Sequence, residues 1–386
     1  MTGIVGRISG MLVGGCDLRV DGQFAARCRC WLDLDQEEFA VEDPDRLGIN
    51  AGEDRITFQN LMFPTQTGEL RAGELRVSFA RSRPHMGGMD VTDTVVARTF
   101  DFLSLAPVWR FACNEPVEFI TTNVAEEVFL RPGKRSFSRV DLDCGGQLIG
   151  ADHGMCVVNC PDFGEAHKTA LELAVGCPLQ ECARQSGNRL TLWLSSWKAG
   201  GNFCPLFDAA TDGGFVSNEK REAGIMEVYR AALSFQQQQP DFGRAFRLAI
   251  ASYLQSRSFQ IGYTLRMLAV MHLLEWLDGA NTLDARVLVR TFGLKDGVAK
   301  AVMVLRNQVS HNHHDAAKRT DLLTSVEKAC RAFEKDGIDL AELGQGDREL
   351  GLLNYHFSLV GKLLLERIGA DVVPVLFLPG YGRFSQ

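Results

Sequence analysis

The chain has 386 residues, more than one hydrophobic core usually serves, so two domains are expected. Hydrophobic residues make up 46% and charged residues 23%, as in an ordinary soluble protein, and no run reaches the roughly 18 apolar residues of a membrane span, which excludes a membrane-spanning chain. The net charge of -7 argues against broad nonspecific binding to nucleic acid, but it permits a local basic site.

The first twenty residues are partly apolar, but Arg7 interrupts them and no small-residue cleavage site follows. We therefore interpret this segment as mature protein. The 11 cysteines are odd in number and are scattered among apolar residues, without the regular spacing of a small disulfide-bonded scaffold. This pattern predicts reduced thiols and a cytoplasmic protein.

Up to about residue 215, short β-type runs alternate with Gly, Pro, Asn and Asp. The clearest runs are 55–58, 75–79, 94–98, 117–120, 155–158 and 190–194. One helix is predicted at 165–175, where Ala170, Leu171 and Val175 follow helical spacing and Gly176 can end the helix. The first domain, residues 1–215, is therefore expected to be β-rich.

Turn-forming residues at 208–214 mark the change to a second pattern. Helical periodicity then covers 219–238, 241–256, 258–278, 283–292, 296–310, 316–335 and 347–368. Pro240, Gly279 and Gly337 fall at the breaks between these segments. The second domain, residues 216–386, is predicted to be a helical bundle, which makes the chain an α+β protein.

An apolar tail follows the last predicted helix, at 372–382. Its β-branched residues allow it to lie against the bundle or to return to the first domain, and Pro374 argues against a central strand.

The segment around 296–314 carries the most chemical information. Its apolar residues at i, i+4, i+7 and i+11 form one helical stripe: Val298, Val302, Leu305 and Val309. Arg306 lies at the edge of that stripe, Asn307 follows it, and His311 comes five residues later. A cation at this position is costly to bury unless it meets an anion or a polar partner, and phosphate is one such anion.

The run Arg306-Asn307-Gln308-Val309-Ser310-His311 resembles the Arg-Asn-x-x-x-His form of the motif of HEPN ribonucleases. A helical C-terminal domain behind an unrelated N-terminal one resembles the Apea-like HEPN proteins linked to bacterial phage defence. The resemblance covers about residues 219–370. It implies a metal-independent RNA endonuclease that needs no cofactor, leaves a cyclic phosphate and acts as a homodimer.

The chemistry of the motif suits this reaction. Attack by a ribose 2′-OH on the adjacent phosphate needs proton transfer near neutral pH, for which the His311 imidazole is suited. The planar Arg306 guanidinium is suited to stabilise the charged phosphorane, and Asn307 completes the motif. HEPN domains often carry a polar residue on an earlier helix that orients the catalytic pair, and Glu275, a lone acid in an apolar helix, is the candidate for that role.

The spacing raises a geometric difficulty. On an uninterrupted helix, five residues correspond to about 500°, which leaves Arg306 and His311 roughly 140° apart around the axis. Either the helix loosens at Ser310, or two chains contribute their motifs to one cleft. The resemblance implies the second arrangement, a two-fold dimer through this helix.

Other interpretations remain open. Arg306 and His311 could be a carboxylate-paired arginine and an exposed helix-end histidine, and the bundle could be a non-catalytic dimerisation module. His272, near Glu275, is expected to pack rather than to bind a ligand, and Glu275 itself could be an ordinary surface acid.

Metal binding is a further alternative. The run from His311 to Asp315 holds three histidines, but nearly contiguous ligands do not easily close a tetrahedral site. The pairs Cys28/Cys30 and Cys156/Cys160 lack a second ligand pair at zinc-like spacing, so they are predicted to be buried thiols. We therefore expect no metal.

The strand-rich domain has no catalytic motif of its own. We expect it to regulate the nuclease by sensing a trigger, such as a phage component.

Overall fold

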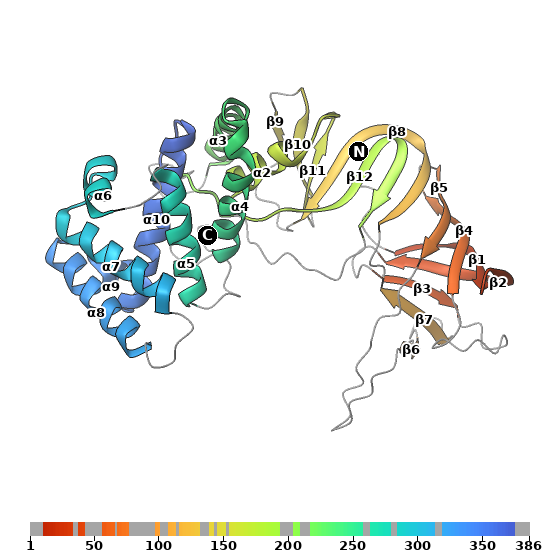
Figure 1. Cartoon of the computed structure of the whole chain (residues 1–386). Helices are drawn as coiled ribbons and strands as arrows, with labels where there is room; N and C mark the ends of the chain where they lie inside the picture. Colours follow the sequence, from red (N-terminus) through yellow and green to blue (C-terminus); the bar gives the residue numbers. More distant parts are fainter. Residues whose placement is uncertain are drawn as a thin grey trace, which may run out of the picture. The chain divides into compact units, whose positions relative to one another are not determined.

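The computed structural model describes residues 11–33, 38–42, 56–65, 68–76, 97–100, 107–112, 116–131, 139–142, 145–151, 154–193, 204–208, 217–257, 263–278, 284–312 and 319–374. The chain forms two compact units (Figure 1). The first, called the sheet unit, comprises residues 1–131, 144–162 and 180–198, and the second, called the helical unit, comprises residues 132–143, 163–179 and 199–386. The α+β class predicted from the sequence is confirmed.

The sheet unit is built from antiparallel strands. Their bounds are β1 (Met11–Val20), β2 (Gln23–Asp33), β3 (Glu38–Glu42), β4 (Ile56–Thr65), β5 (Gly68–Arg76), β6 (Ala97–Phe100), β7 (Pro107–Ala112), β8 (Val117–Arg131), β10 (Gln147–Ala151), β11 (Gly154–Val158) and β12 (Gln180–Leu192). Neighbouring strands follow the order β6-β7-β3-β2-β1-β4-β5-β8-β11-β10, and β12 also pairs with β8. The long strand β8 pairs with β12 along one edge and with β5 and β11 along the other.

Local sequence explains the first hairpin. Asp21 and Gly22 connect β1 to β2 with φ angles of 50° and 82°, the positive values that a two-residue type I′ turn needs. Gly14 in β1 is required for a different reason, because a Cβ there would lie 2.1 Å from the carbonyl oxygen of Met62 in β4. These positions set how β1 lies between its two neighbours.

One face of the sheet forms the core of this unit. Alternate residues of the strands are buried there, as in Cys16 and Leu18 of β1. Two pairs of phenylalanine rings meet edge to face, Phe39 with Phe58 at 5.0 Å and Phe63 with Phe119 at 5.9 Å between centroids. These buried rings therefore pack together with aliphatic residues and cysteines in the core of the sheet unit.

The helical unit contains the short strand β9 (Arg139–Asp141) and a set of helices. The helices are α2 (Glu165–Val175), α3 (Asn218–Gln238), α4 (Pro240–Ser256), α5 (Tyr263–Asp278), α6 (Ala285–Phe292), α7 (Asp296–Asn312), α8 (Arg319–Lys335), α9 (Leu340–Leu343) and α10 (Arg348–Ile368). The 21-residue helix α10 packs against α3, α5, α8 and α9 (Figure 1). The Tyr253 hydroxyl of α4 also donates to the Phe357 carbonyl of α10 at 2.9 Å.

Capping residues set the helix ends. The side chains of Ser217, Asp284 and Asp347 accept backbone N–H groups at the starts of α3, α6 and α10. Pro240 stands at the first position of α4, and Gly369 in the left-handed conformation ends α10. The predicted helical segments are confirmed to within a few residues, apart from residues 258–262, 283 and 316–318, which lie outside the described residues.

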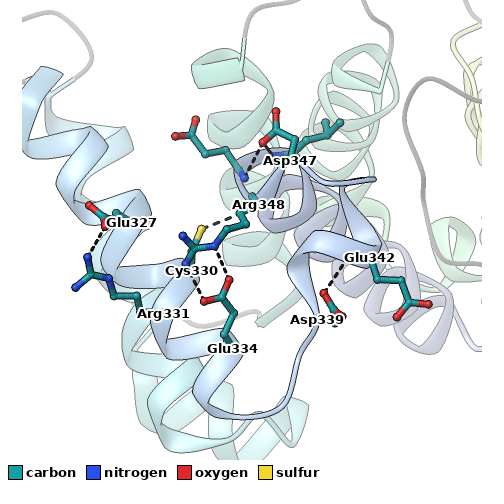
Figure 2. A network of polar contacts seen from close by, with 10 residues as sticks. Glu327, Cys330, Arg331, Glu334, Asp339, Glu342, Asp347 and Arg348 are labelled. Atoms are coloured by element: carbon teal, nitrogen blue, oxygen red, sulfur yellow. Dashed lines mark hydrogen bonds and ion pairs between the residues drawn. The ribbon is translucent and has the colours of Figure 1, made fainter.

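Figure 2 shows polar contacts that join α8 to α10 and that cap the N-termini of α9 and α10. The Arg348 guanidinium meets the Glu334 carboxylate through two hydrogen bonds, at 2.5 and 2.7 Å. Arg331 pairs with Glu327 on α8, and Asp347 caps α10 by accepting from the backbone N–H of residues 349 and 350. Each of these two arginines pairs with a carboxylate of the same unit. We therefore interpret the network as stabilising the helices rather than as a site for an anionic ligand.

The tertiary contacts of α2 differ from the sequence expectation. The helix forms at 165–175 as predicted, but it packs against α3 and α4 in the helical unit. Its residues from Thr169 to Val175 are all buried. The two units therefore interleave along the chain, whereas the sequence pattern predicts one boundary near residue 215. Helical periodicity specifies a helix, but it does not specify which neighbour covers the helix.

The start of the C-terminal tail pairs with the segment 204–208 of the helical unit. Pro374 forms an isolated antiparallel bridge with Phe207, and the Asp208 N–H donates to the Val373 carbonyl at 2.7 Å. The tail residues beyond 374 lie outside the described residues. Among the helices in the described part of the chain, none combines the length and apolar character needed to cross a bilayer.

Candidate functional site

Helix α7 carries the predicted motif. Three residues of the predicted apolar stripe are buried: Val298 is 1% exposed, and Val302 and Leu305 are 0% exposed. The helix packs against α5, α6 and α8. The stripe is confirmed over these three positions, whereas the side chain of Val309 lies outside the described residues. Arg306 follows Leu305 directly, so it stands at the border between the packed face of α7 and solvent.

Arg306 is half-buried and Asn307 is exposed. The Arg306 Nη1 donates to the Asn307 Oδ1 at 3.0 Å. An arginine has five N–H donors in a planar fork, so this contact occupies one donor and orients the group along the helix surface. The structure thus brings together the first two residues of the motif.

His311 lies on the same helix, which continues without interruption to Asn312. The helix therefore does not loosen at Ser310. Five residues of regular helix separate Arg306 from His311 by roughly 140° around the axis and about 7.5 Å along it. One copy of α7 does not present both residues on one face. The side chain of His311 lies outside the described residues, as do residues 313–315 of the predicted histidine cluster.

Glu275 lies on α5, which packs against α7. This places the candidate positioning residue on a neighbouring helix, although the side chain itself lies outside the described residues. The next residue of α5, Trp276, donates its Nε1–H to His272 Nε2, one turn earlier, at 3.2 Å. His272 is exposed, and this hydrogen bond holds its ring beside Trp276 on the surface of α5. His272 therefore packs at the edge of the helix, as the sequence predicts.

The cysteine pairs behave as predicted. Cys28 and Cys30 on β2 are buried, and so are Cys156 on β11 and Cys160 just after it. Burial raises the pKa of the Cys156 thiol, and the nearby Glu127 carboxylate raises it further. Within the described part of the chain, no group of three or more His, Cys, Asp or Glu residues is placed to hold a metal ion.

Sequence reasoning missed one polar cluster in the helical unit. Arg257 is only 5% exposed at the end of α4, and its Nη2 donates to the sulfur of Cys204 at 3.1 Å. The two residues are 53 positions apart, and neither belongs to a local motif. The sequence signal was weak: an arginine just after an amphipathic helix, and one cysteine among many.

Comparison with known proteins adds no relative. No protein-family model, no curated protein and no solved structure matches this chain. The function must therefore be argued from the residues of the chain itself.

Proposed function

We propose that the helical unit is a metal-independent RNA endonuclease of the HEPN type, in which Arg306 of one protomer and His311 of the partner subunit form one cleft. The observation that carries this proposal is the unbroken helix α7, with a half-buried Arg306 bonded to Asn307 beside a buried apolar stripe. A continuous helix separates Arg306 from His311 around its axis, and two antiparallel copies would remove that separation.

The proposed reaction is a transesterification. The ribose 2′-OH attacks the adjacent phosphorus while the His311 imidazole accepts its proton, and the 5′-oxygen leaves with a proton from the medium or from a second imidazole. The products are a 2′,3′-cyclic phosphate and a 5′-hydroxyl. The Arg306 guanidinium donates to the phosphoryl oxygens, where negative charge grows in the transition state.

Further parts of the proposal follow the resemblance of the motif. Asn307 holds the guanidinium along α7, and Glu275 on the neighbouring helix α5 orients the catalytic pair. The sheet unit, which carries no catalytic motif, restrains the nuclease until a trigger such as a phage component binds. Such an enzyme would act in antiviral defence or in toxin-like growth arrest in the cytoplasm.

The test is cleavage of labelled single-stranded RNA by the purified full chain in EDTA. We expect fragments that end in a cyclic phosphate, and strongly reduced cleavage by the His311→Ala variant. Cleavage that requires a divalent cation would favour a metal-dependent hydrolase instead. Because the sheet unit restrains the nuclease, the assay uses an excess of enzyme over RNA to detect the residual activity of the full chain. Absence of cleavage under these conditions, with and without metal, would favour a non-catalytic dimerisation module.

A further inference from the structure

Cys204 differs from the other cysteines that the structure describes. Its side chain is partly exposed, whereas the others are buried: Cys16, Cys28, Cys30, Cys156, Cys160, Cys177, Cys182 and Cys330. Reactive cysteines are partly accessible and lie near positive charge, while buried cysteines in apolar surroundings are inert. By accessibility alone, Cys204 is the described thiol best placed to react.

Arg257 supplies the positive charge. Its Nη2 donates to the Cys204 sulfur at 3.1 Å, and its Nη1 donates to the Gly176 carbonyl at 3.4 Å. The guanidinium also stacks over the Tyr253 ring, 5.9 Å from the centroid. Because Arg257 is almost fully buried, water screens its charge less than it would on the surface. The Cys204 sulfur thus accepts a hydrogen bond from a buried, positively charged guanidinium.

A second thiol, Cys177, belongs to the segment whose backbone contacts Cys204. The Cys204 N–H donates to the Val175 carbonyl at 3.1 Å, at the last residue of α2. Gly176 allows this approach, because a Cβ there would lie 1.7 Å from the Cys204 carbonyl oxygen. Cys177 comes next and is buried. Burial raises the pKa of the Cys177 thiol, Cys204 raises it further, and Arg257 opposes both effects, so all three groups interact electrostatically.

We propose that Cys204 is a peroxide-reactive site and that Cys177 is its resolving partner. The Cys204 sulfur attacks hydrogen peroxide, the O–O bond breaks, and the sulfur is oxidised by two electrons to a sulfenic acid while hydroxide leaves. The Cys177 sulfur then attacks the Cys204 sulfur, an S–S bond forms, and the displaced hydroxyl leaves as water with the Cys177 proton. In total, two thiols and one peroxide give one disulfide and two waters.

The disulfide would tie the start of the 204–208 segment to the end of α2, both of which belong to the helical unit. Because Cys177 is buried and holds its proton, its attack is slower than the first step. The sulfenic acid on Cys204 should therefore accumulate long enough to be trapped. This site does not depend on the proposed nuclease activity.

The experiment treats the reduced full chain with hydrogen peroxide, with and without dimedone, and maps the products by tryptic mass spectrometry. Trypsin separates Cys204, on the peptide 199–220, from Cys177, on the peptide 169–184. We expect dimedone on Cys204 at least about tenfold faster than on Cys330, a buried thiol on α8. Without dimedone, we expect the two peptides to be linked, with fragment ions that place the bond on Cys177 rather than Cys182.

Variants distinguish the roles of the residues. Cys177→Ser should retain the sulfenic acid on Cys204 and lose the cross-link, whereas Cys330→Ser should behave as the parent. Arg257→Lys keeps a cation but not the guanidinium fork, so oxidation of Cys204 should slow severalfold. Equal labelling of Cys204 and Cys330 in the folded parent would overturn the proposal, and so would a cross-link that survives Cys177→Ser.

Discussion

Replacing His311 should lower the rate of RNA cleavage without lowering the stability of the fold. His311 stands in the last turn of α7, where a single side chain usually contributes little to stability, so His311→Ala should melt like the parent. Loss of the proton-transfer group should lower RNA cleavage by about 100-fold or more. The matched control is His272→Ala, which removes an exposed histidine from α5 and should leave cleavage unchanged. Parental turnover by a folded His311→Ala would show that the imidazole takes no part.

Arg306→Lys tests whether the guanidinium acts through its geometry. A lysine keeps the charge but cannot present the planar fork to a phosphate, so we expect cleavage to fall by about 100-fold. Arg331→Lys, an exposed arginine of α8 that is paired with Glu327, is the matched control. Near-parental rates for Arg306→Lys, measured on the same labelled RNA, would indicate a merely electrostatic or structural arginine.

His356 on α10 makes stability depend on pH. It is fully buried beside the Phe333 and Tyr355 rings, and its Nδ1–H donates to the Leu352 carbonyl at 2.7 Å. Burial lowers its pKa from 6.5 to about 4, although the Leu352 carbonyl opposes the shift. Between these values the unfolded chain binds the proton and the folded chain does not. The stabilisation by neutral His356 is therefore complete above pH 6.5 and is lost as the pH falls to about 4.

The expected loss is about 3 kcal/mol of unfolding free energy. Urea unfolding of the parent and of His356→Phe between pH 7.5 and 4.5 would measure it, because the difference between the two chains removes the contributions of other groups. Glu172 is one such group, since burial raises its pKa and its contribution to stability therefore falls as the pH rises, opposite to that of His356. Parallel curves for parent and variant would contradict the prediction.

At the scale of the element, the continuous helix α7 keeps Arg306 and His311 of one chain apart, so the proposed site needs two chains. Mixing two variants that each lack one of these residues tests this arrangement. Arg306→Ala and His311→Ala chains are each expected to be inactive. In a heterodimer of the two, one cleft lacks both groups, and the other retains Arg306 of one protomer and His311 of the partner subunit. After subunit exchange, an equal mixture should recover about a quarter of parental cleavage.

The control for the mixture is each variant at the same total concentration. Sedimentation of the parent as a monomer at micromolar concentration, with cleavage retained, would reject a cleft shared between copies. If the two variants are shown to form heterodimers and the mixture still does not cleave RNA, the antiparallel pairing of α7 is rejected.

At the scale of the whole molecule, the position of α2 is the main departure from the sequence expectation. Leu171 is fully buried in α2, which packs on α3 and α4. Leu171→Ala should therefore destabilise the helical unit by about 2–5 kcal/mol. Hydrogen exchange should show lost protection in α3 and α4, with β1 and β2 unchanged. Loss of protection in the sheet alone would instead place α2 with the first half of the chain.

Local patterns in the sequence determined the elements of this protein. The helix at 165–175, the segments around α3 to α10 and the β-type runs follow from periodicity, capping residues and turn residues, which act over a few positions. The buried stripe of α7 and the contact between Arg306 and Asn307 belong to this class, because all their residues stand on one helix and no distant segment of the chain is needed to bring them together.

Only the tertiary structure decided which elements cover one another and which distant groups meet. Helical spacing is satisfied by any apolar partner, so it did not place α2 on α3 and α4. The contact of Arg257 with Cys204, the neighbouring thiol of Cys177 and the burial of His356 all depend on chain segments far apart in sequence. Their chemistry comes from desolvation and from fixed charges, which exist only once the chain has packed.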